Sequence, residues 1–84
     1  MSEYYFTFHS LTHGQSAAQI MREHGIPVSL NRAPKALAQQ GCGYALQLYS
    51  MNPLAQYNLL RANGASPGHV YRRMPNGLWE ELPF

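Results

Sequence analysis

Hydrophobic and polar residues alternate with two different periods along the chain, and each change of period marks a predicted element. Stretches with a period of two, rich in aromatic and β-branched residues, predict strands. In the first of them Tyr4, Phe6 and Phe8 share one side, which we expect to be buried. The predicted strands cover residues 3–9, 26–30, 44–49, 70–74 and 78–82.

Two segments instead have the three-to-four-residue spacing of amphipathic helices. The first begins at Ser10 or Thr12 as N-cap and runs to about His24, before Gly25. The second has Asn52 as N-cap and Pro53 at its first position, and ends at residues 63–64 (Asn-Gly). Their predicted buried stripes are Ala17, Ile20, Met21 and His24 in the first helix, and Leu54, Tyr57 and Leu60 or Leu59 in the second.

Two connections have recognisable features. Asn31 to Gly43 is long, and residues 36–40 have the composition of a short helical turn. Residues 75–78 (Pro-Asn-Gly-Leu) predict a hairpin, because Asn-Gly suits a two-residue type I′ turn. In that register, oppositely charged residues face each other across the ribbon. The predicted pairs are Arg73 with Glu80 and Arg72 with Glu81.

The element order is therefore β-α-β-β-α-β followed by a terminal strand. This order predicts an α+β protein with a ferredoxin-like sandwich, in which both helices cover one face of an antiparallel sheet. We expect one domain over residues 1–84, with residues 74–84 as a C-terminal β-hairpin extension.

The charge content limits the partners that we expect. Charged residues make up 12% of the 84 residues and the net charge is +2, which is too weak for a nucleic-acid footprint. Arg72 and Arg73 have predicted glutamate partners, so cross-strand pairing explains them better than phosphate binding. A surface with few charges favours self-association, including a homodimer. With neither an apolar run that would span a bilayer nor a secretory leader, we expect no membrane contact and a cytoplasmic location.

The one cysteine, Cys42, stands between Gly41 and Gly43. The glycines are expected to leave the thiol exposed, and backbone N–H groups around them can form an anion-binding nest that favours thiolate. Arg32 and Lys35, in the same connection, would add positive potential. The alternative is that Cys42 is a small buried hydrophobic residue at the start of the third strand.

Other candidate chemistry is sparse. The chain has four histidines and no aspartate, and the histidines are better explained as surface or capping residues than as metal ligands. Catalytic triads, paired carboxylates and nucleotide-binding loops do not occur. We therefore expect no cofactor, no metal and no stand-alone enzymatic activity.

Several short motifs together resemble the family of selenium/sulfur (Se/S) carrier protein-like domains, over most of residues 4–73. They are residues 9–13 (His-Ser-Leu-Thr-His), 23–28 (Glu-His-Gly-Ile-Pro-Val), 34–35 (Pro-Lys), 42–46 (Cys-Gly-Tyr-Ala-Leu) and 63–64 (Asn-Gly). The resemblance implies that Cys42 holds sulfur or selenium as a persulfide or selenosulfide, received from one protein and passed to another. Two departures lower the expected activation of the thiol. Residues 47–49 (Gln-Leu-Tyr) stand where members often have a basic residue, and residues 39–41 (Gln-Gln-Gly) replace small hydroxyl residues.

A second hypothesis assigns no thiol chemistry to the chain. The tyrosines, Trp79 and Met51 would form an apolar patch on the open sheet face, through which a non-catalytic module dimerises or docks to another protein. The accessibility of the Cys42 thiol separates this hypothesis from a carrier function.

Overall fold

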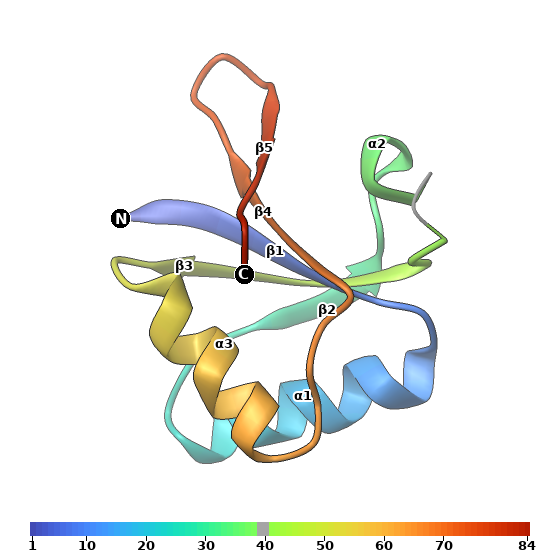
Figure 1. Cartoon of the computed structure of the whole chain (residues 1–84), viewed down its shortest axis with the longest axis vertical. Coiled ribbons are helices and arrows are strands. Elements are labelled where there is room, and N and C mark those ends of the chain that lie inside the picture. The colour runs from blue at the N-terminus through green and yellow to red at the C-terminus, as the bar shows by residue number, and fades with distance from the viewer. Residues whose placement is uncertain (39–40) are drawn as a thin grey trace.

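In a computed structural model that describes residues 1–38 and 41–84, the elements follow the predicted order, and the helical turn predicted before the third strand is a short helix (Figure 1). The elements are β1 (Ser2–Phe8), α1 (Leu11–Glu23), β2 (Ser29–Arg32), α2 (Lys35–Ala38), β3 (Tyr44–Ser50), α3 (Pro53–Ala62), β4 (His69–Arg73) and β5 (Trp79–Glu81).

Within these residues the strands form one five-stranded sheet in the order β2-β3-β1-β4-β5, and every neighbouring pair is antiparallel. Phe6, at the middle of β1, lies opposite Leu46 of β3 on one side and Val70 of β4 on the other. Helices α1 and α3 cover the same face of the sheet, and α2 lies on the opposite side (Figure 1). The predicted α+β class and antiparallel sheet are confirmed.

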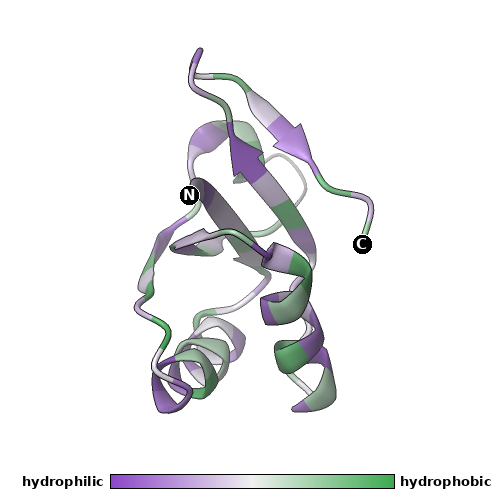
Figure 2. Cartoon of the chain, turned by 90° about the vertical axis from the view of Figure 1, so that its left-hand side faces the viewer, coloured by the Kyte–Doolittle hydropathy of each residue, from purple (hydrophilic) through white to green (hydrophobic). Residues whose placement is uncertain are grey.

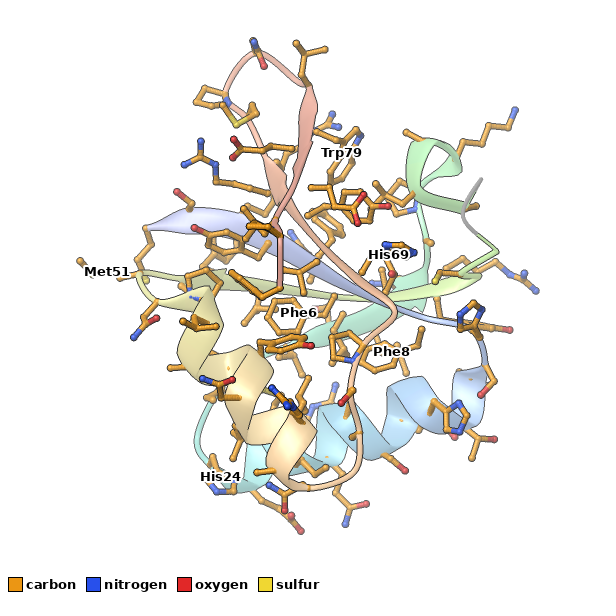
Figure 3. All side chains as sticks on the ribbon, in the orientation of Figure 1. Phe6, Phe8, His24, Met51, His69 and Trp79 are labelled. Atoms are coloured by element: carbon orange, nitrogen blue, oxygen red, sulfur yellow. The ribbon has the colours of Figure 1, made fainter. Side chains whose placement is uncertain are left out.

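The main core lies between the sheet and the two long helices. Figure 3 shows Phe6 and Phe8 pointing from β1 toward the helices, whereas His69 and Trp79 lie on the other side of the sheet. Tyr4, Phe6 and Phe8 are all buried, as their shared parity predicted. The buried members of this core are Tyr4, Phe6, Phe8, Ala17, Ala18, Met21, Leu46, Leu48, Leu60 and Val70.

The helix starts agree with the predicted caps. The Ser10 hydroxyl accepts a hydrogen bond from the His13 N–H (3.2 Å), and the Asn52 side chain accepts one from the Ala55 N–H (3.3 Å). The predicted burial of two stripe residues is wrong, because His24 and Leu54 are exposed. Both lie at helix ends, His24 as the C-cap of α1 and Leu54 in the first turn of α3, where the helix surface is no longer covered by the sheet.

The second strand begins later than predicted. Residues 26–28 do not pair with β3, and β2 instead covers Ser29–Arg32. The Ile26 N–H donates to the Met21 carbonyl, which ties this segment to the end of α1 rather than to the sheet. The predicted helical turn at residues 36–40 corresponds to α2, and residues 39–40 lie outside the described residues.

The register predicted for the terminal hairpin is wrong by one residue. Arg72 lies opposite Glu80, and Arg73 lies opposite Trp79. The Met74 N–H donates to the Leu78 carbonyl, so three residues form the loop instead of two. Gly77 has a positive φ of 85° and Asn76 does not, whereas a type I′ turn needs both. Figure 2 shows strongly hydrophilic segments in both strands of this hairpin.

The specific ferredoxin-like topology stays a prediction. Strand β5 extends the sheet order beyond the strands of that topology, and α2 interrupts the connection between β2 and β3. None of the helices formed by residues 1–38 and 41–84 has the length and apolar character that crossing a membrane requires.

Candidate functional site

The thiol of Cys42 is buried, with 0% of the residue exposed. The prediction of an exposed thiol is therefore wrong. Glycines on either side remove side chains that would shield the sulfur, but they also let other parts of the chain approach it closely. Cys42 lies two residues before the start of β3 and outside the main core, with Gly68 and His9 as its neighbours.

His9 supplies the polar contact of the sulfur. Its Nε2 atom lies 3.9 Å from Cys42 Sγ, and its Nδ1 atom lies 3.2 Å from the Gly41 carbonyl oxygen. A carbonyl oxygen can only accept, so Nδ1 carries the hydrogen of this bond. In the neutral imidazole, Nε2 is then the unprotonated nitrogen, and its lone pair is available to the thiol hydrogen.

Gly68, the residue before β4, covers the sulfur. A methyl group at position 68 would lie 2.9 Å from Cys42 Sγ and 3.6 Å from His9 Nε2, so only glycine fits here without a shift. The Gly68 N–H donates to the Thr7 carbonyl (2.7 Å), and the Thr7 hydroxyl exchanges hydrogen bonds with the backbone of His69. These bonds hold the start of β4 over the thiol.

The two glycines beside the cysteine have different roles. Gly41 has a φ of 83°, a left-handed conformation that favours glycine. Its N–H donates to the Ala38 carbonyl and its carbonyl accepts from His9, so the N–H is already used and does not contribute to an anion nest. Gly43 has no positive φ, and its carbonyl accepts from the Ala33 N–H, which extends the pairing of β2 with β3.

Arg32 and Lys35 are not brought to the thiol by any contact among the described residues. The Arg32 guanidinium lies over the Tyr44 ring, 5.6 Å from its centroid. Tyr44 is the partner of Phe8 in the sheet and therefore shares the helix-facing side, whereas Cys42 is not among the buried residues of the helix-facing core. Lys35 is exposed at the first position of α2.

Strand β4 carries two further ionisable side chains, Tyr71 and His69, next to the segment that covers the sulfur. Burial raises the pKa of Tyr71, and the nearby negative charges of Glu81 and of a Cys42 thiolate add to this effect. His69 Nδ1 lies 2.7 Å from a carboxylate oxygen of Glu81, which occupies that side chain. The phenol of Tyr71 thus remains protonated, and His9 is the base in direct contact with the sulfur.

Sequence reasoning missed His9, although a signal existed. In the sequence, His9 only ends the first predicted strand and begins the 9–13 motif, without a link to Cys42. In an antiparallel pairing of the first and third strands, however, the end of one strand lies beside the start of the other. Phe8 indeed lies opposite Tyr44, which brings His9, one residue beyond Phe8, close to Cys42, two residues before Tyr44.

Metal binding has no support in the part of the chain that the structure describes. Within it, no three side chains of the histidine, cysteine, aspartate or glutamate type converge. His9 and Cys42 form a pair, and the other nearby histidine, His69, is bound to Glu81. The arrangement can exchange a proton between a thiol and an imidazole.

Comparison with known protein families identifies a match over most of the chain. The sequence model of the family described as "Putative Se/S carrier protein-like" matches residues 3–72. This range runs from the second residue of β1 to the last residue but one of β4 and includes both members of the thiol–imidazole pair. No curated protein and no solved structure matches the chain.

Proposed function

The chain belongs to the Se/S carrier protein-like family, and from this premise we propose that Cys42 is the atom-carrying residue. Its thiol accepts one sulfur or selenium atom from a protein donor, holds it as a persulfide or selenosulfide, and releases it to a protein acceptor. The observation that carries the proposal is that the matched residues contain the chain's one cysteine, with an imidazole nitrogen 3.9 Å from its sulfur.

The chemistry of transfer needs a thiolate, because thiolate is the nucleophile in exchange at sulfur. The adjacent imidazole can supply this thiolate, because a base beside a thiol activates it by accepting its proton. Arg32 and Lys35 do not serve this purpose in the proposal, because neither contacts the sulfur among the described residues. Gly41 supports it indirectly, through the carbonyl that orients His9.

Complete burial of the thiol adds a requirement. A donor protein reaches Cys42 only after His9 or the segment around Gly68 moves aside, since these two groups contact the sulfur. Both are exposed on their outer sides, so neither movement has to open the main core. The proposal therefore includes a local opening at the surface end of β1 and β4.

Mass spectrometry tests the carrier function directly. The full chain is incubated with a cysteine desulfurase and cysteine, and we expect a mass increase of about 32 Da per sulfur atom that disappears on reduction. The matched control is Cys42→Ala. Absence of the adduct, or an equal adduct on the control, would show that Cys42 is not a carrier.

The burial of Cys42 favours a second candidate, a non-catalytic interaction module in which the cysteine only packs. Its surface would be the open sheet face, where Tyr49 is 60% exposed beside a hollow of about 700 Å³. This hollow is lined by the start of β1, the end of β3 and the β4–β5 hairpin, and Cys42 does not line it. Met51, 87% exposed, projects from the β3–α3 connection (Figure 3).

Two measurements separate the candidates. A native thiol that resists a thiol reagent at neutral pH supports the module and contradicts the carrier. Light scattering over a concentration series then tests association through the sheet. A homodimer that dissociates in Tyr49→Ser would support the interaction-module function. A monomer at every concentration would exclude self-association as that function.

A further inference from the structure

A carrier thiol must lose its proton before it reacts, and the thiol of Cys42 is fully buried. Cys42 is 0% exposed, so water does not reach the sulfur in the closed structure. His9, in contrast, is exposed at the end of β1 while its Nε2 atom lies 3.9 Å from Sγ. Its ring therefore connects the thiol with solvent.

On the basis of the proposed function, we propose that His9 is the proton acceptor of Cys42, and that the Gly41 carbonyl sets the tautomer for this task. The carbonyl holds the hydrogen of the neutral ring on Nδ1, 3.2 Å away, and so leaves Nε2 free to take the thiol proton. His9 becomes an imidazolium and Cys42 a thiolate, and the two opposite charges stabilise each other.

The ionisable groups of the neighbouring elements do not replace His9. Tyr71 of β4 is a neutral phenol with a raised pKa. His69, also of β4, is engaged with Glu81 of β5. Lys35 of α2 is exposed, and Arg32 of β2 lies over Tyr44. Among the described residues, His9 is thus the group placed to accept a proton directly from Sγ.

The transfer step balances without an oxidant. The Cys42 thiolate attacks the terminal sulfur of a persulfide R–S–SH on the donor protein, and the donor's S–S bond breaks with its electron pair going to the donor sulfur. The imidazolium of His9 returns its proton to this leaving thiolate. The sum is Cys42–SH + R–S–SH → Cys42–S–SH + R–SH, and a terminal selenium atom follows the same path.

The size of the added atom has a structural consequence for His9. An S–S bond is about 2.05 Å long, so a sulfur added toward the ring would overlap Nε2, which lies 3.9 Å from Sγ. A sulfur added in this direction therefore requires the ring to turn outward as the carrier is loaded. Because His9 follows the last residue of β1 and is exposed, this rotation leaves the sheet pairing intact.

The test is the alkylation rate of Cys42 by iodoacetamide as a function of pH in the full-length protein. We expect the wild-type rate to change between about pH 5 and 8, where histidine changes charge, and His9→Gln to lose this change. Near neutral pH we expect the variant to react at least about tenfold more slowly. His13→Gln, which changes an exposed histidine of α1, is the matched control and should behave as wild type.

Each outcome decides the proposal. The proposal would be overturned if the pH profile of Cys42 alkylation were unchanged in His9→Gln and His9→Ala. It would also be overturned if both variants were alkylated faster at every pH, because His9 would then only cover the thiol. Persulfide loading is measured separately by mass. A histidine-dependent alkylation profile without loading would leave the role of His9 intact and remove the carrier function. Persulfide loading together with an unchanged alkylation profile would support the carrier function and remove the role of His9.

Discussion

Residues next to the ends of two strands and one residue of a connection converge at the sulfur of Cys42, and each imposes a different constraint. Gly68 leaves no room for a side chain above it, and Gly41 presents a carbonyl that is reachable because its backbone is left-handed. His9 occupies the remaining side. A thiol enclosed in this way reacts only as fast as its cover opens, so the pair of Cys42 and His9 couples reactivity to local motion.

A second residue cluster, on the open sheet face, predicts a dependence of stability on pH. Burial raises the pKa of Tyr5 to about 12 from an ordinary value of 10, and its hydrogen bond to Glu3 adds to the effect. The native state thus holds this proton more tightly than the unfolded state. Its contribution to the free energy of unfolding is complete below pH 10 and is lost as the pH rises to about 12.

Urea unfolding across this pH range checks the prediction. The loss of stability between pH 10 and about 12 should be smaller in Tyr5→Phe than in wild type. Tyr49→Phe, which changes an exposed tyrosine on the same face, is the control and should retain the wild-type slope. Parallel slopes in wild type and Tyr5→Phe would contradict the assignment to Tyr5.

Among the elements, the β4–β5 hairpin differs most from its prediction. Its three-residue loop places Arg73 opposite Trp79, and the guanidinium lies over the indole, 4.4 Å from the ring centroid. The Trp79 ring also meets the Tyr5 ring edge to face, at 4.8 Å between centroids. These aromatic contacts join the hairpin to β1, and only Arg72 keeps a glutamate partner, Glu80, at 3.1 Å.

The loop conformation predicts the effect of substitutions at Gly77. Because its φ is 85°, Gly77→Ala should destabilise the hairpin by about 1 kcal/mol. Gly77→Asn should cost less, since asparagine tolerates the left-handed region. Fluorescence of Trp79, the one tryptophan, reports on hairpin opening during denaturation. Equal losses for the two variants would argue against a left-handed residue at this position.

For the whole molecule, the C-terminal residues are part of the packing and not an appendage. The family match ends at residue 72, yet Leu82 and Phe84 pack against the main core. The Phe84 ring lies 5.2 Å from that of Tyr57 on α3, and the Leu82 N–H donates to the Val70 carbonyl. The terminal segment therefore closes one end of the layer between sheet and helices.

This packing predicts a stability effect of the last residue. Phe84→Ala should lower the free energy of unfolding by about 1–2 kcal/mol, because a partly buried aromatic ring loses its contacts. Pro83→Ala, at an exposed neighbour, should change it by less than about 0.5 kcal/mol. Thermal or urea denaturation measures both. A loss in Phe84→Ala no larger than in Pro83→Ala would mean that the terminus does not contribute.

Local signals were sufficient for the elements whose residues interact mainly with their near neighbours in the chain. The alternation of Tyr4, Phe6 and Phe8 identified the buried side of β1, and Ser10 and Asn52 identified the helix starts, because periodicity and capping depend on a few adjacent residues. The family was also evident from motifs such as residues 42–46.

Tertiary structure decided the features that depend on residues distant in the chain. The burial of Cys42 results from Gly68, 26 positions later, and from His9, 33 positions earlier. The late start of β2 results from its attachment to α1, and the hairpin register from a loop one residue longer than expected. Flanking glycines permit either an exposed or a covered thiol. Only the pairing of β1 with β3 and β4, which brings His9 and Gly68 to the sulfur, selects the covered one.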